Sequence, residues 1–372
     1  MVIDLKKLGK YEVGILDYFL MFIPIAVILE FRHASGTLIF AASAISIIPL
    51  AAIMGTATEH LSEKLGAGIG GFLNATFGNA AELIISVIAI KEGLYDVVKA
   101  SITGSIIGNI LLVLGLSFVA GGLKQKIVHF NATTANLYSS MLVLCSFGLV
   151  VPTVVNTLLG EHHSLTKAAV DNLSLKLSLA IAIVLFITYI LSLVFSLKSH
   201  KHLYGVGDGE TDGIESEESW SSAKSFSVLL AATVGISFMS EFLVKSLEEA
   251  TKSLGMNEVF VGVIVVAFVG NAAEHSTSIL MALKNKMDVS VSIAIGSSSQ
   301  VAMFLAPVLV FISYFVGSSP MNLTFTPLET LSILFSAFLV NFIAADGQTH
   351  WMEGVQLLAL YIILGIAYFF IF

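Results

Sequence analysis

Long apolar runs separated by short polar breaks dominate the chain from about residue 15 onward. A helix needs about 20 mostly apolar residues to cross the hydrocarbon core of a bilayer. Eleven runs approach this length, with approximate cores at 15–31, 37–59, 69–90, 98–120, 133–154, 169–197, 225–247, 258–283, 289–316, 327–345 and 354–371. The pattern predicts an all-α integral membrane protein with eleven transmembrane helices.

The composition points to the same class of protein. Of the 372 residues, 56% are hydrophobic and 12% are charged, whereas soluble domains carry about 25% charged residues. Such a chain lacks the polar surface to cover itself in water, so we expect the lipid bilayer as its partner. The single cysteine, Cys145, excludes an intramolecular disulfide and a cysteine-based metal site. No basic patch with interleaved aromatic residues occurs, which argues against a nucleic-acid partner.

Charge is distributed unevenly along the chain, whose net charge is -8. If the N-terminus is cytoplasmic, eleven of the 18 Lys and Arg residues fall on cytoplasmic segments and seven fall outside. This bias favours a cytoplasmic N-terminus. Residues 205–219 hold six acids and no Lys or Arg, and would then form a solvated cytoplasmic loop. The alternative is an acidic helix that gathers divalent cations near the cytoplasmic mouth.

An internal repeat is the most informative feature of the sequence. Residues 78–82, with the sequence Gly-Asn-Ala-Ala-Glu, recur 192 positions later as residues 270–274. The two copies lie in the third and eighth apolar runs, so an odd number of spans separates them and they must cross the bilayer in opposite directions. Inverted repeats of this kind are typical of secondary transporters with a central substrate site.

The repeat predicts the domain organisation. We expect an N-terminal transmembrane helix in residues 1–35 and a first five-helix repeat in residues 36–200. An acidic cytoplasmic linker, residues 201–223, then leads to a second five-helix repeat in residues 224–372. The alternative explanation is a small-residue packing motif of the Gly-xxx-Gly kind. Packing explains the Gly and Ala residues of the motif but leaves the Asn and Glu of each copy unexplained.

Each motif places an amide and an acid on one helix face. Asn79 and Glu82 are three residues apart, as are Asn271 and Glu274, so each pair lines one stripe. An ionised acid in the middle of a membrane helix costs about 2.5 to 3.5 kcal/mol, and neither apolar run contains a Lys or Arg to neutralise it. The partner is therefore a second polar stripe, a proton or a bound cation.

The oxygen-only donor set of the two stripes favours a particular cation. Two carboxylates with amide and hydroxyl oxygens suit calcium, which tolerates irregular coordination, better than zinc or copper. Burial and repulsion between like charges also favour protonated carboxyl groups. Cation and protons then compete for one site, which is costly to carry across the membrane when it is empty and doubly ionised. This asymmetry is a physical basis for obligatory exchange. We expect no resident cofactor, with calcium and protons as the transported species.

Further polar residues follow each motif. Ser105 and Asn109 come after Gly104, and Ser297 and Gln300 come after Gly296. We expect these two glycines, like Gly78 and Gly270 in the motifs, to interrupt their helices and release carbonyl oxygens for an ion. The alternative for the polar residues is hydrogen bonding between helices. Glu59 and Glu241 occupy corresponding places before the two motifs; an interfacial acid is the alternative for Glu59.

At these residues the sequence resembles the calcium/proton exchanger (CAX) family of the cation/calcium exchanger superfamily. The resemblance rests on the paired Gly-Asn-Ala-Ala-Glu motifs and on Gly104-Ser105-Ile106-Ile107-Gly108-Asn109 and Gly296-Ser297-Ser298-Ser299-Gln300. It implies eleven helices and proton-driven removal of cytosolic calcium. It also implies ion-binding roles for Glu82 and Glu274 and auxiliary roles for Glu59 and Glu241. Gly108 departs from the family, where a Ser commonly precedes the Asn, so no side-chain role is expected there.

Other classes of membrane protein fit the sequence less well. Sodium/calcium exchangers of the same superfamily carry a Pro just before the acid, where this chain has Ala81 and Ala273. A channel normally uses an oligomeric ring or a hydrophobic gate, and no common enzyme or ATP-binding motif occurs. We expect a multi-pass protein of a prokaryotic plasma membrane, with a vacuolar membrane as the alternative; a homo-oligomer is left open.

Overall fold

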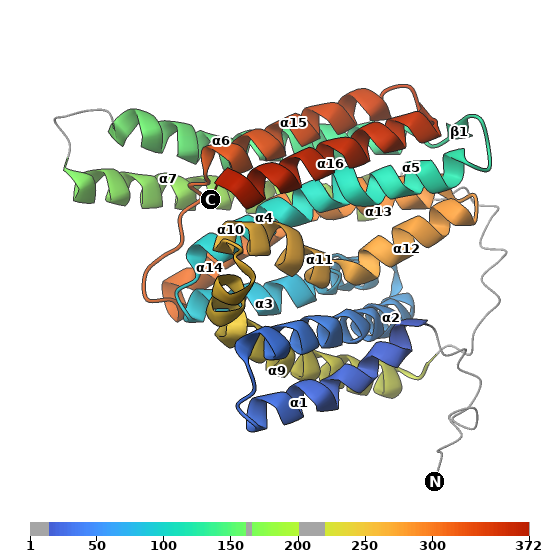
Figure 1. Cartoon of the computed structure of the whole chain (residues 1–372). Coiled ribbons are helices and arrows are strands. Elements are labelled where there is room, and N and C mark those ends of the chain that lie inside the picture. The colour runs from blue at the N-terminus through green and yellow to red at the C-terminus, as the bar shows by residue number, and fades with distance from the viewer. Residues whose placement is uncertain (1–14, 161–165, 201–219, 372) are drawn as a thin grey trace, which may run out of the picture.

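The computed structural model describes residues 15–160, 166–200 and 220–371, and these are almost entirely helical (Figure 1). In the first half of the chain the elements are η2 (Ile15–Met21), α1 (Phe22–Phe31), α2 (Gly36–Phe77), α3 (Ala80–Lys91), α4 (Tyr95–Ile107), η3 (Gly108–Val113), α5 (Leu114–Gly122), β1 (Val128–His129), α6 (Ala132–Gly160), α7 (Lys167–Val194) and η4 (Phe195–Ser199).

The second half begins after the acidic segment. Its elements are α9 (Ser222–Leu254), α10 (Glu258–Phe260), η5 (Val261–Val266), α11 (Ala267–Gly270), α12 (Ala272–Leu283), α13 (Met287–Gln300), η6 (Val301–Leu305), α14 (Ala306–Val316), α15 (Pro327–Ala344), β2 (Gln348–Thr349) and α16 (Trp351–Ile371). The six acids of residues 205–219, predicted to form a solvated loop or an acidic helix, lie outside the described residues.

The described helices are those of a multi-pass membrane protein. Eight of them are long and apolar enough to cross a bilayer, and a ninth candidate is a pair of helices bent by 64° between Gly270 and Ala272. A shorter apolar helix covers Tyr18–Phe31. The all-helical membrane class is therefore confirmed, whereas the count of eleven transmembrane helices stays a prediction.

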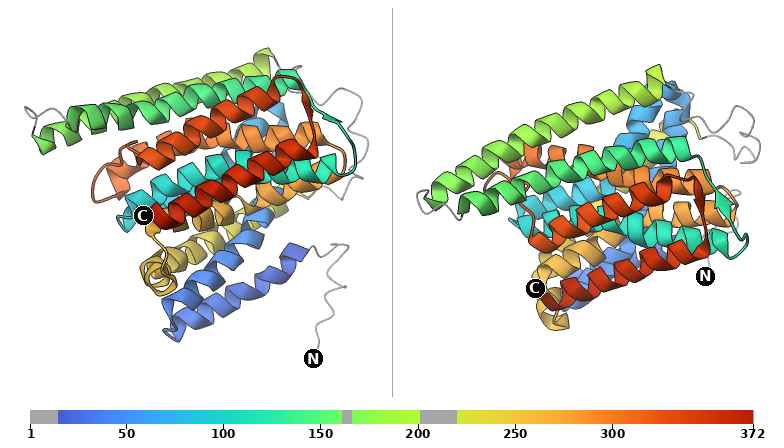
Figure 2. Two further views of the ribbon diagram at one scale, coloured as in Figure 1. Left: turned by 45° about the horizontal axis from the view of Figure 1, so that its top comes forward. Right: turned by 90° about the horizontal axis from the view of Figure 1, so that it is seen from above.

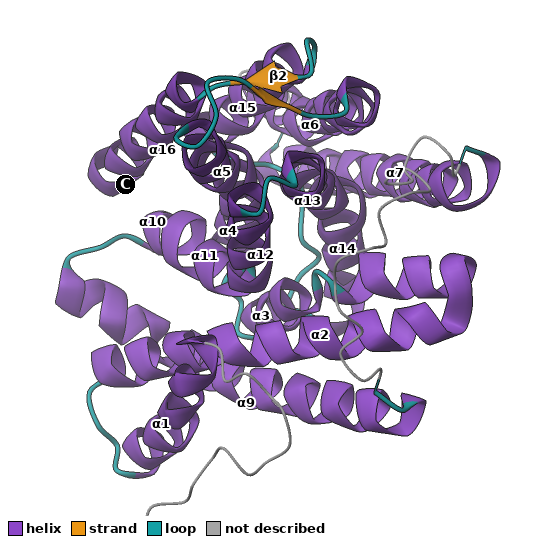
Figure 3. Ribbon diagram, turned by 90° about the vertical axis from the view of Figure 1, so that its right-hand side faces the viewer, coloured by secondary structure: helices purple, strands orange, loops and turns teal. Residues whose placement is uncertain are grey.

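The boundary between the second and third predicted spans is a reversal of the chain without a loss of helical turns. Helical turns continue from Gly36 to Phe77, through the expected polar break, and the first break falls at Gly78 and Asn79. A Cβ on Gly70 would clash with the backbone carbonyl of Ser62, although eight residues of a straight helix span about 12 Å. The chain therefore doubles back within α2, as Figure 3 shows.

Contacts between loops define two ends of the helix bundle. At one end, called the β end, β1 pairs with β2, Lys124 Nζ donates to the Leu283 carbonyl oxygen at 2.5 Å, and the Asn131 amide donates to Asp288. At the opposite end, the Tyr95 hydroxyl donates to the carbonyl oxygen of Ser319 at 2.7 Å. The chain alternates between these two ends along its length (Figure 1).

The two helices that follow the repeated motifs run in opposite directions between these ends. Helix α3 finishes at Lys91, close to the start of α4 at Tyr95 and hence at the opposite end. Helix α12 finishes at Leu283, which contacts Lys124 at the β end. The acids of the two motifs therefore meet in the middle of the bundle, on helices that diverge from there toward opposite ends.

Helices α6 and α7 lie side by side along one flank of the bundle (Figure 2). On α7, the apolar side chains of Val184, Ile187 and Leu191 are exposed. Large apolar residues on the outside of a helical bundle are expected where lipid rather than water surrounds it. This flank therefore faces the bilayer, and the polar residues discussed below lie in the interior.

Candidate functional site

Both repeated motifs lie where a helix is broken. Asn79 has φ -98° and ψ 17°, and Asn271 has φ -94° and ψ 7°. At each motif, this single Asn therefore has a non-helical backbone conformation between two helices. A new helix begins directly after each Asn, and Glu82 and Glu274 lie in the first turns of α3 and α12. The positive end of a helix dipole stabilises negative charge at such a position. The local fold thus points both acids at the helix breaks.

Each acid packs against the glycine of the other motif. A Cβ added to Gly270 would lie 2.8 Å from Cγ of Glu82, and a Cβ added to Gly78 would lie 3.7 Å from Oε1 of Glu274. The two carboxyl groups are close enough to repel each other when both are ionised. The repeat therefore brings together the two acids, 192 residues apart in sequence, at one site.

Amide and hydroxyl groups of both halves surround Glu274. Ser297 Oγ donates a hydrogen bond to Oε2 of Glu274. Asn109 Nδ2 lies 3.2 Å from Ser297 Oγ and 3.3 Å from Asn271 Oδ1. Ser297 therefore connects the acid of one half with the amide of the other.

The two motif amides also make contacts between the halves. Asn79 Nδ2 donates to Gln300 Oε1 at 2.9 Å, and Asn271 Nδ2 donates to Ser105 Oγ at 2.8 Å and to the Ala267 carbonyl oxygen at 2.8 Å. Asn79 on one side thus meets Gln300, whereas Asn271 on the other meets Ser105. These unequal partners make the two halves of the site chemically different.

Three buried oxygen atoms of the site have no hydrogen-bond partner among the described residues. They are Oδ1 of Asn79 and both carboxyl oxygens of Glu82, and the two side chains are 0% and 2% exposed. A buried carboxylate without donors is costly. The arrangement is chemically reasonable only when Glu82 is protonated or when a cation is bound by these oxygens.

The donor set restricts the kind of cation that can bind. Among the described residues, no group of three or more His, Cys, Asp and Glu side chains could hold a metal ion. Glu82 and Glu274 must therefore be supplemented by the oxygens of amides, hydroxyls or the backbone. An all-oxygen site of this kind suits a hard cation such as calcium.

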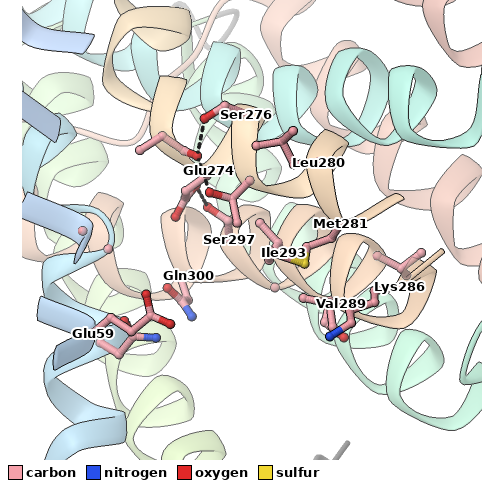
Figure 4. A pocket seen from close by; sticks show the side chains of 18 of the residues that line it. Glu59, Glu274, Ser276, Leu280, Met281, Lys286, Val289, Ile293, Ser297 and Gln300 are labelled. Carbon is pink, nitrogen blue, oxygen red and sulfur yellow. Dashed lines mark hydrogen bonds between the residues drawn. The ribbon is translucent and has the colours of Figure 1, made fainter. Parts of the chain in front are cut away.

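A cavity of about 1340 Å³ leads from the β end to Glu274 (Figure 4). Its wall includes Glu59 of α2 and Ser297 and Gln300 of α13, and its outer part includes Lys286 and Asp288. Gly78 and Gly270 line its inner part, where Glu274 is half-buried, whereas Glu82 is not among the lining residues. In this conformation the pathway from the β end reaches one acid and stops before the other.

Two of the predicted helix interruptions are wrong. Helix α4 continues through Gly104 as far as Ile107, and α13 continues through Gly296 as far as Gln300. A Cβ on Gly104 would clash with the Val263 carbonyl oxygen, so this glycine permits close packing of two helices. The backbone hydrogen-bonding pattern changes instead from α-helical to π-helical in η3 and η6, which start directly after α4 and α13.

The two auxiliary acids lie in different surroundings. Glu59 is exposed and lines the cavity. Glu241 does not line it; its carboxylate lies 2.6 Å from Lys245 Nζ, four residues further along α9, and its side chain is 45% exposed. The structure therefore brings Glu59, but not Glu241, to the cavity that reaches Glu274.

Sequence reasoning missed the mouth of the cavity. Lys286 and Asp288 line it, and Asp288 accepts a hydrogen bond from the backbone amide of Asn131. In the sequence analysis, Lys286 was only one of the eleven Lys and Arg residues assigned to cytoplasmic segments. Nothing in the repeat marks these residues, and the partner of Asp288, Asn131, lies 157 positions earlier, so only the fold brings the two together.

The described fold and site define a multi-pass membrane protein with two acids at paired helix breaks. A family model for sodium/calcium exchanger proteins matches residues 35–198 and 224–371, and the chain belongs to this family. The chain is 43% identical to a Ca(2+)/H(+) antiporter of Aphanothece halophytica over 363 residues, which cover 94% of this chain and 95% of that protein.

Two further comparisons agree with this family. A Ca(2+)/H(+) antiporter of Synechocystis sp. (strain ATCC 27184 / PCC 6803 / Kazusa) is 44% identical over 365 residues, covering 94% of this chain and 96% of that protein. The solved structure of native YfkE superimposes with a TM-score of 0.79 at 40% identity, covering 94% of this chain and 99% of that one. The predicted resemblance to the cation/calcium exchanger superfamily is thus confirmed.

Proposed function

We propose that this protein is a secondary antiporter that exchanges cytosolic calcium for protons by alternating access. The observation that carries the proposal is the packing of Glu82 against Gly270 and of Glu274 against Gly78, which places two acids at one oxygen-lined site. The relatives named as calcium/proton antiporters, which match almost the whole chain, support the same substrates. They are transporters, which is consistent with a protein that is not an enzyme.

In this proposal the architecture is a pair of inverted repeats. The opposite directions of α3 and α12 support it, as do the helix breaks at Asn79 and Asn271. We place one five-helix repeat in residues 36–200 and the other in residues 224–372, after an N-terminal helix. With the N-terminus in the cytoplasm of a prokaryotic cell, the β end faces the cytoplasm.

Loading begins from the β end through the cavity. A calcium ion attracted by Glu59 at the wall moves inward and exchanges water for the oxygens of Glu274, Ser297 and Gln300. Glu82 and Asn79, whose buried oxygens have no donor among the described residues, complete the site from the other half. Calcium suits this route because it tolerates irregular coordination, whereas magnesium releases its water reluctantly.

Protons return through the same site. A cation bound by Glu82 and Glu274 neutralises both carboxylates, and two protons do the same. The empty, doubly ionised site carries two like charges in a low-dielectric interior, which opposes its passage across the membrane. Conversion between the two access states is therefore easy for the calcium-loaded and protonated forms, and slow for the empty form. This difference couples calcium export to proton import.

The two auxiliary acids act at opposite ends. Glu59 serves the pathway that is open at the β end. Glu241 occupies the corresponding place before the second motif, so we propose that it serves the pathway toward the opposite end. Its ion pair with Lys245 would then be exchanged for contact with the transported ion when that pathway opens.

Transport in proteoliposomes tests the proposed function. Purified protein is reconstituted, and radioactive calcium uptake is measured with an imposed pH gradient and, separately, with an imposed sodium gradient. Uptake driven by the pH gradient alone supports calcium/proton exchange. Uptake driven by sodium would identify a sodium/calcium exchanger, and uptake that needs neither gradient would identify a channel.

A further inference from the structure

A second cavity, of about 610 Å³, lies at the β end, apart from the cavity that reaches Glu274. It forms where α5 ends at Gly122 and α16 begins at Trp351. Lys124, Lys126 and His350 line it, and no acid is among the described residues of its wall. The wall therefore favours an anion, in contrast to the acidic transport site.

Apolar side chains flank this basic wall. Leu123 is 74% exposed and Ile127 is 51% exposed, on either side of the two lysines, and Trp351 in the wall is 44% exposed. Tryptophan is enriched at the level of the lipid headgroups, and Lys side chains near helix ends reach the same level. The cavity therefore combines an anion-binding wall with a surface that suits acyl chains.

Close packing fixes the wall of the cavity. A Cβ on Gly354 would lie 2.6 Å from the Gly115 carbonyl oxygen, so α5 and α16 are in backbone contact. Gly122 lies directly against the backbone of Trp351, and the pairing of Val128 with Thr349 ties together the two loops next to the cavity. These contacts fix the backbone of the wall, from which the exposed side chains of Lys124 and Lys126 extend.

The charges next to the cavity indicate which residues attract an anion. Nε2 of His350 lies 3.9 Å from Oε1 of Glu353, so a carboxylate adjoins the His350 side of the cavity. Lys124 donates to the Leu283 carbonyl oxygen at the end of α12, but an ammonium group has three donors and two remain. Lys124 and Lys126 therefore supply most of the attraction.

We propose that this cavity binds the phosphate headgroup of an anionic phospholipid in the cytoplasmic leaflet. Lys124 and Lys126 hold the phosphate, and Trp351 lies at the boundary between headgroup and acyl chain. A soluble phosphate would need only the basic wall, whereas the exposed Leu123 and Ile127 beside it match a lipid. The proposal relies on the cytoplasmic orientation of the β end and not on the identity of the transported ions, so it can fail independently of the proposed exchange.

Tryptophan fluorescence can test this site because the chain contains only two tryptophans, Trp220 and Trp351. In the full-length variant Trp220→Phe, reconstituted in phosphatidylcholine, fluorescence is titrated with brominated phosphatidylglycerol or brominated phosphatidylcholine. We expect the anionic lipid to quench Trp351 at lower mole fraction than the zwitterionic lipid. Equal quenching by the two lipids overturns the proposal. This first test leaves Lys124 and Lys126 in place.

Two double variants then separate this site from general charge attraction. Lys124→Gln with Lys126→Gln should lower the relative binding constant for phosphatidylglycerol by up to roughly 30-fold, about the effect of two lysines at an anionic surface. Lys198→Gln with Lys284→Gln removes the same charge from exposed positions that do not line the cavity, and should leave the preference unchanged. An equal loss in both double variants overturns the proposal. Displacement of the lipid by inorganic phosphate would assign the site to a soluble anion and overturn it as well.

Discussion

Glu82 of α3 lies directly against Gly270 of α11, so close that a Cβ on this glycine would be 2.8 Å from Cγ of the acid. The glycine belongs to one copy of the repeated motif and the acid to the other. The glycine of the second copy thus has a steric reason, whereas a Cβ on Gly78 would lie 3.7 Å from Oε1 of Glu274, an ordinary contact. Each copy supplies both an acid and the small surface against which the acid of the other copy packs.

Gly270→Ala should disturb this contact. The added methyl group must displace the Glu82 side chain, and overpacking of this kind costs about 1 to 3 kcal/mol, which corresponds to roughly tenfold or more in binding. We expect weaker calcium binding by isothermal titration calorimetry in the variant, with retained insertion and monodispersity on gel filtration.

Gly55→Ala is the matched control for this change. Gly55 lies on the wall of the same cavity, but a Cβ there would meet no atom within 4 Å. We expect near-normal calcium binding in this variant. If Gly270→Ala also binds calcium normally, the packing of Glu82 against Gly270 does not determine the geometry of the site.

Asn109 offers a second test because it joins the two halves. Its Nδ2 contacts Asn271 Oδ1 and Ser297 Oγ, and its side chain is 1% exposed. Asn109→Ala leaves buried polar groups without a donor, which costs about 1 to 3 kcal/mol. We expect a lower unfolding temperature and weaker calcium binding in detergent. Calcium should raise the unfolding temperature of the variant by less than it raises that of the wild type.

Asn136→Ala controls for the loss of an amide elsewhere in the bundle. Asn136 Nδ2 donates to the Ala344 carbonyl oxygen at 3.4 Å, near the β end. This variant should bind calcium normally whatever its stability. Equal loss of calcium binding in both variants would mean that Asn109 has no particular place in the site.

The sequence predicted the paired acids because residues 78–82 and 270–274 are identical. It also predicted the helix breaks at these motifs, since an Asn after a Gly has weak helical propensity. It failed at Gly104, because small residues serve close packing as well as helix breaks, and at Gly296, where α13 continues and a Cβ would meet only the Tyr138 ring at 3.8 Å. Whether a glycine does one or the other depends on the helix opposite it, for Gly104 the Val263 carbonyl oxygen.

Tertiary contacts explain the other differences. The ion pair of Glu241 with Lys245 follows a four-residue helical spacing that could have been recognised in the sequence. The bonds of Asn109 to the second half, and of Asp288 to Asn131, join residues more than 150 positions apart. Hydrophobic periodicity carries no information about such pairs, and the repeat does not relate them either.

Sidedness of the two motifs can be measured by cysteine labelling. In a Cys145→Ser background, Lys64→Cys and Lys252→Cys are treated with a membrane-impermeant thiol reagent in sealed cells. We expect only Lys252→Cys to react from outside, since the proposed orientation, based on the positive charge of the β end, places this end in the cytoplasm. Permeabilised cells, in which both should react, provide the control. Reaction of both variants in sealed cells would contradict the inverted repeat.

Proton release on calcium binding tests the shared site. If Glu82 and Glu274 bind calcium and protons in turn, as we propose, each must lose its proton before it binds the cation, so calcium binding should release protons and weaken as the pH falls. Isothermal titration of the wild type with calcium, in buffers of different ionisation enthalpy, counts the protons released. A binding enthalpy that is independent of the buffer would contradict competition between calcium and protons.

Removing the titrating charge of either acid should abolish exchange. Glu82→Gln and Glu274→Gln keep the size and hydrogen-bonding capacity of the side chain but prevent the two-charge neutralisation on which the proposed coupling depends. We expect less than about 1% of wild-type calcium uptake in proteoliposomes with a pH gradient, as for loss of several kcal/mol of ion binding. Glu248→Gln is the matched control, because Glu248 is exposed and pairs with Lys252 on the surface of α9; it should transport normally. Near-normal exchange by either of the first two variants would show that the two acids do not share the transported ions.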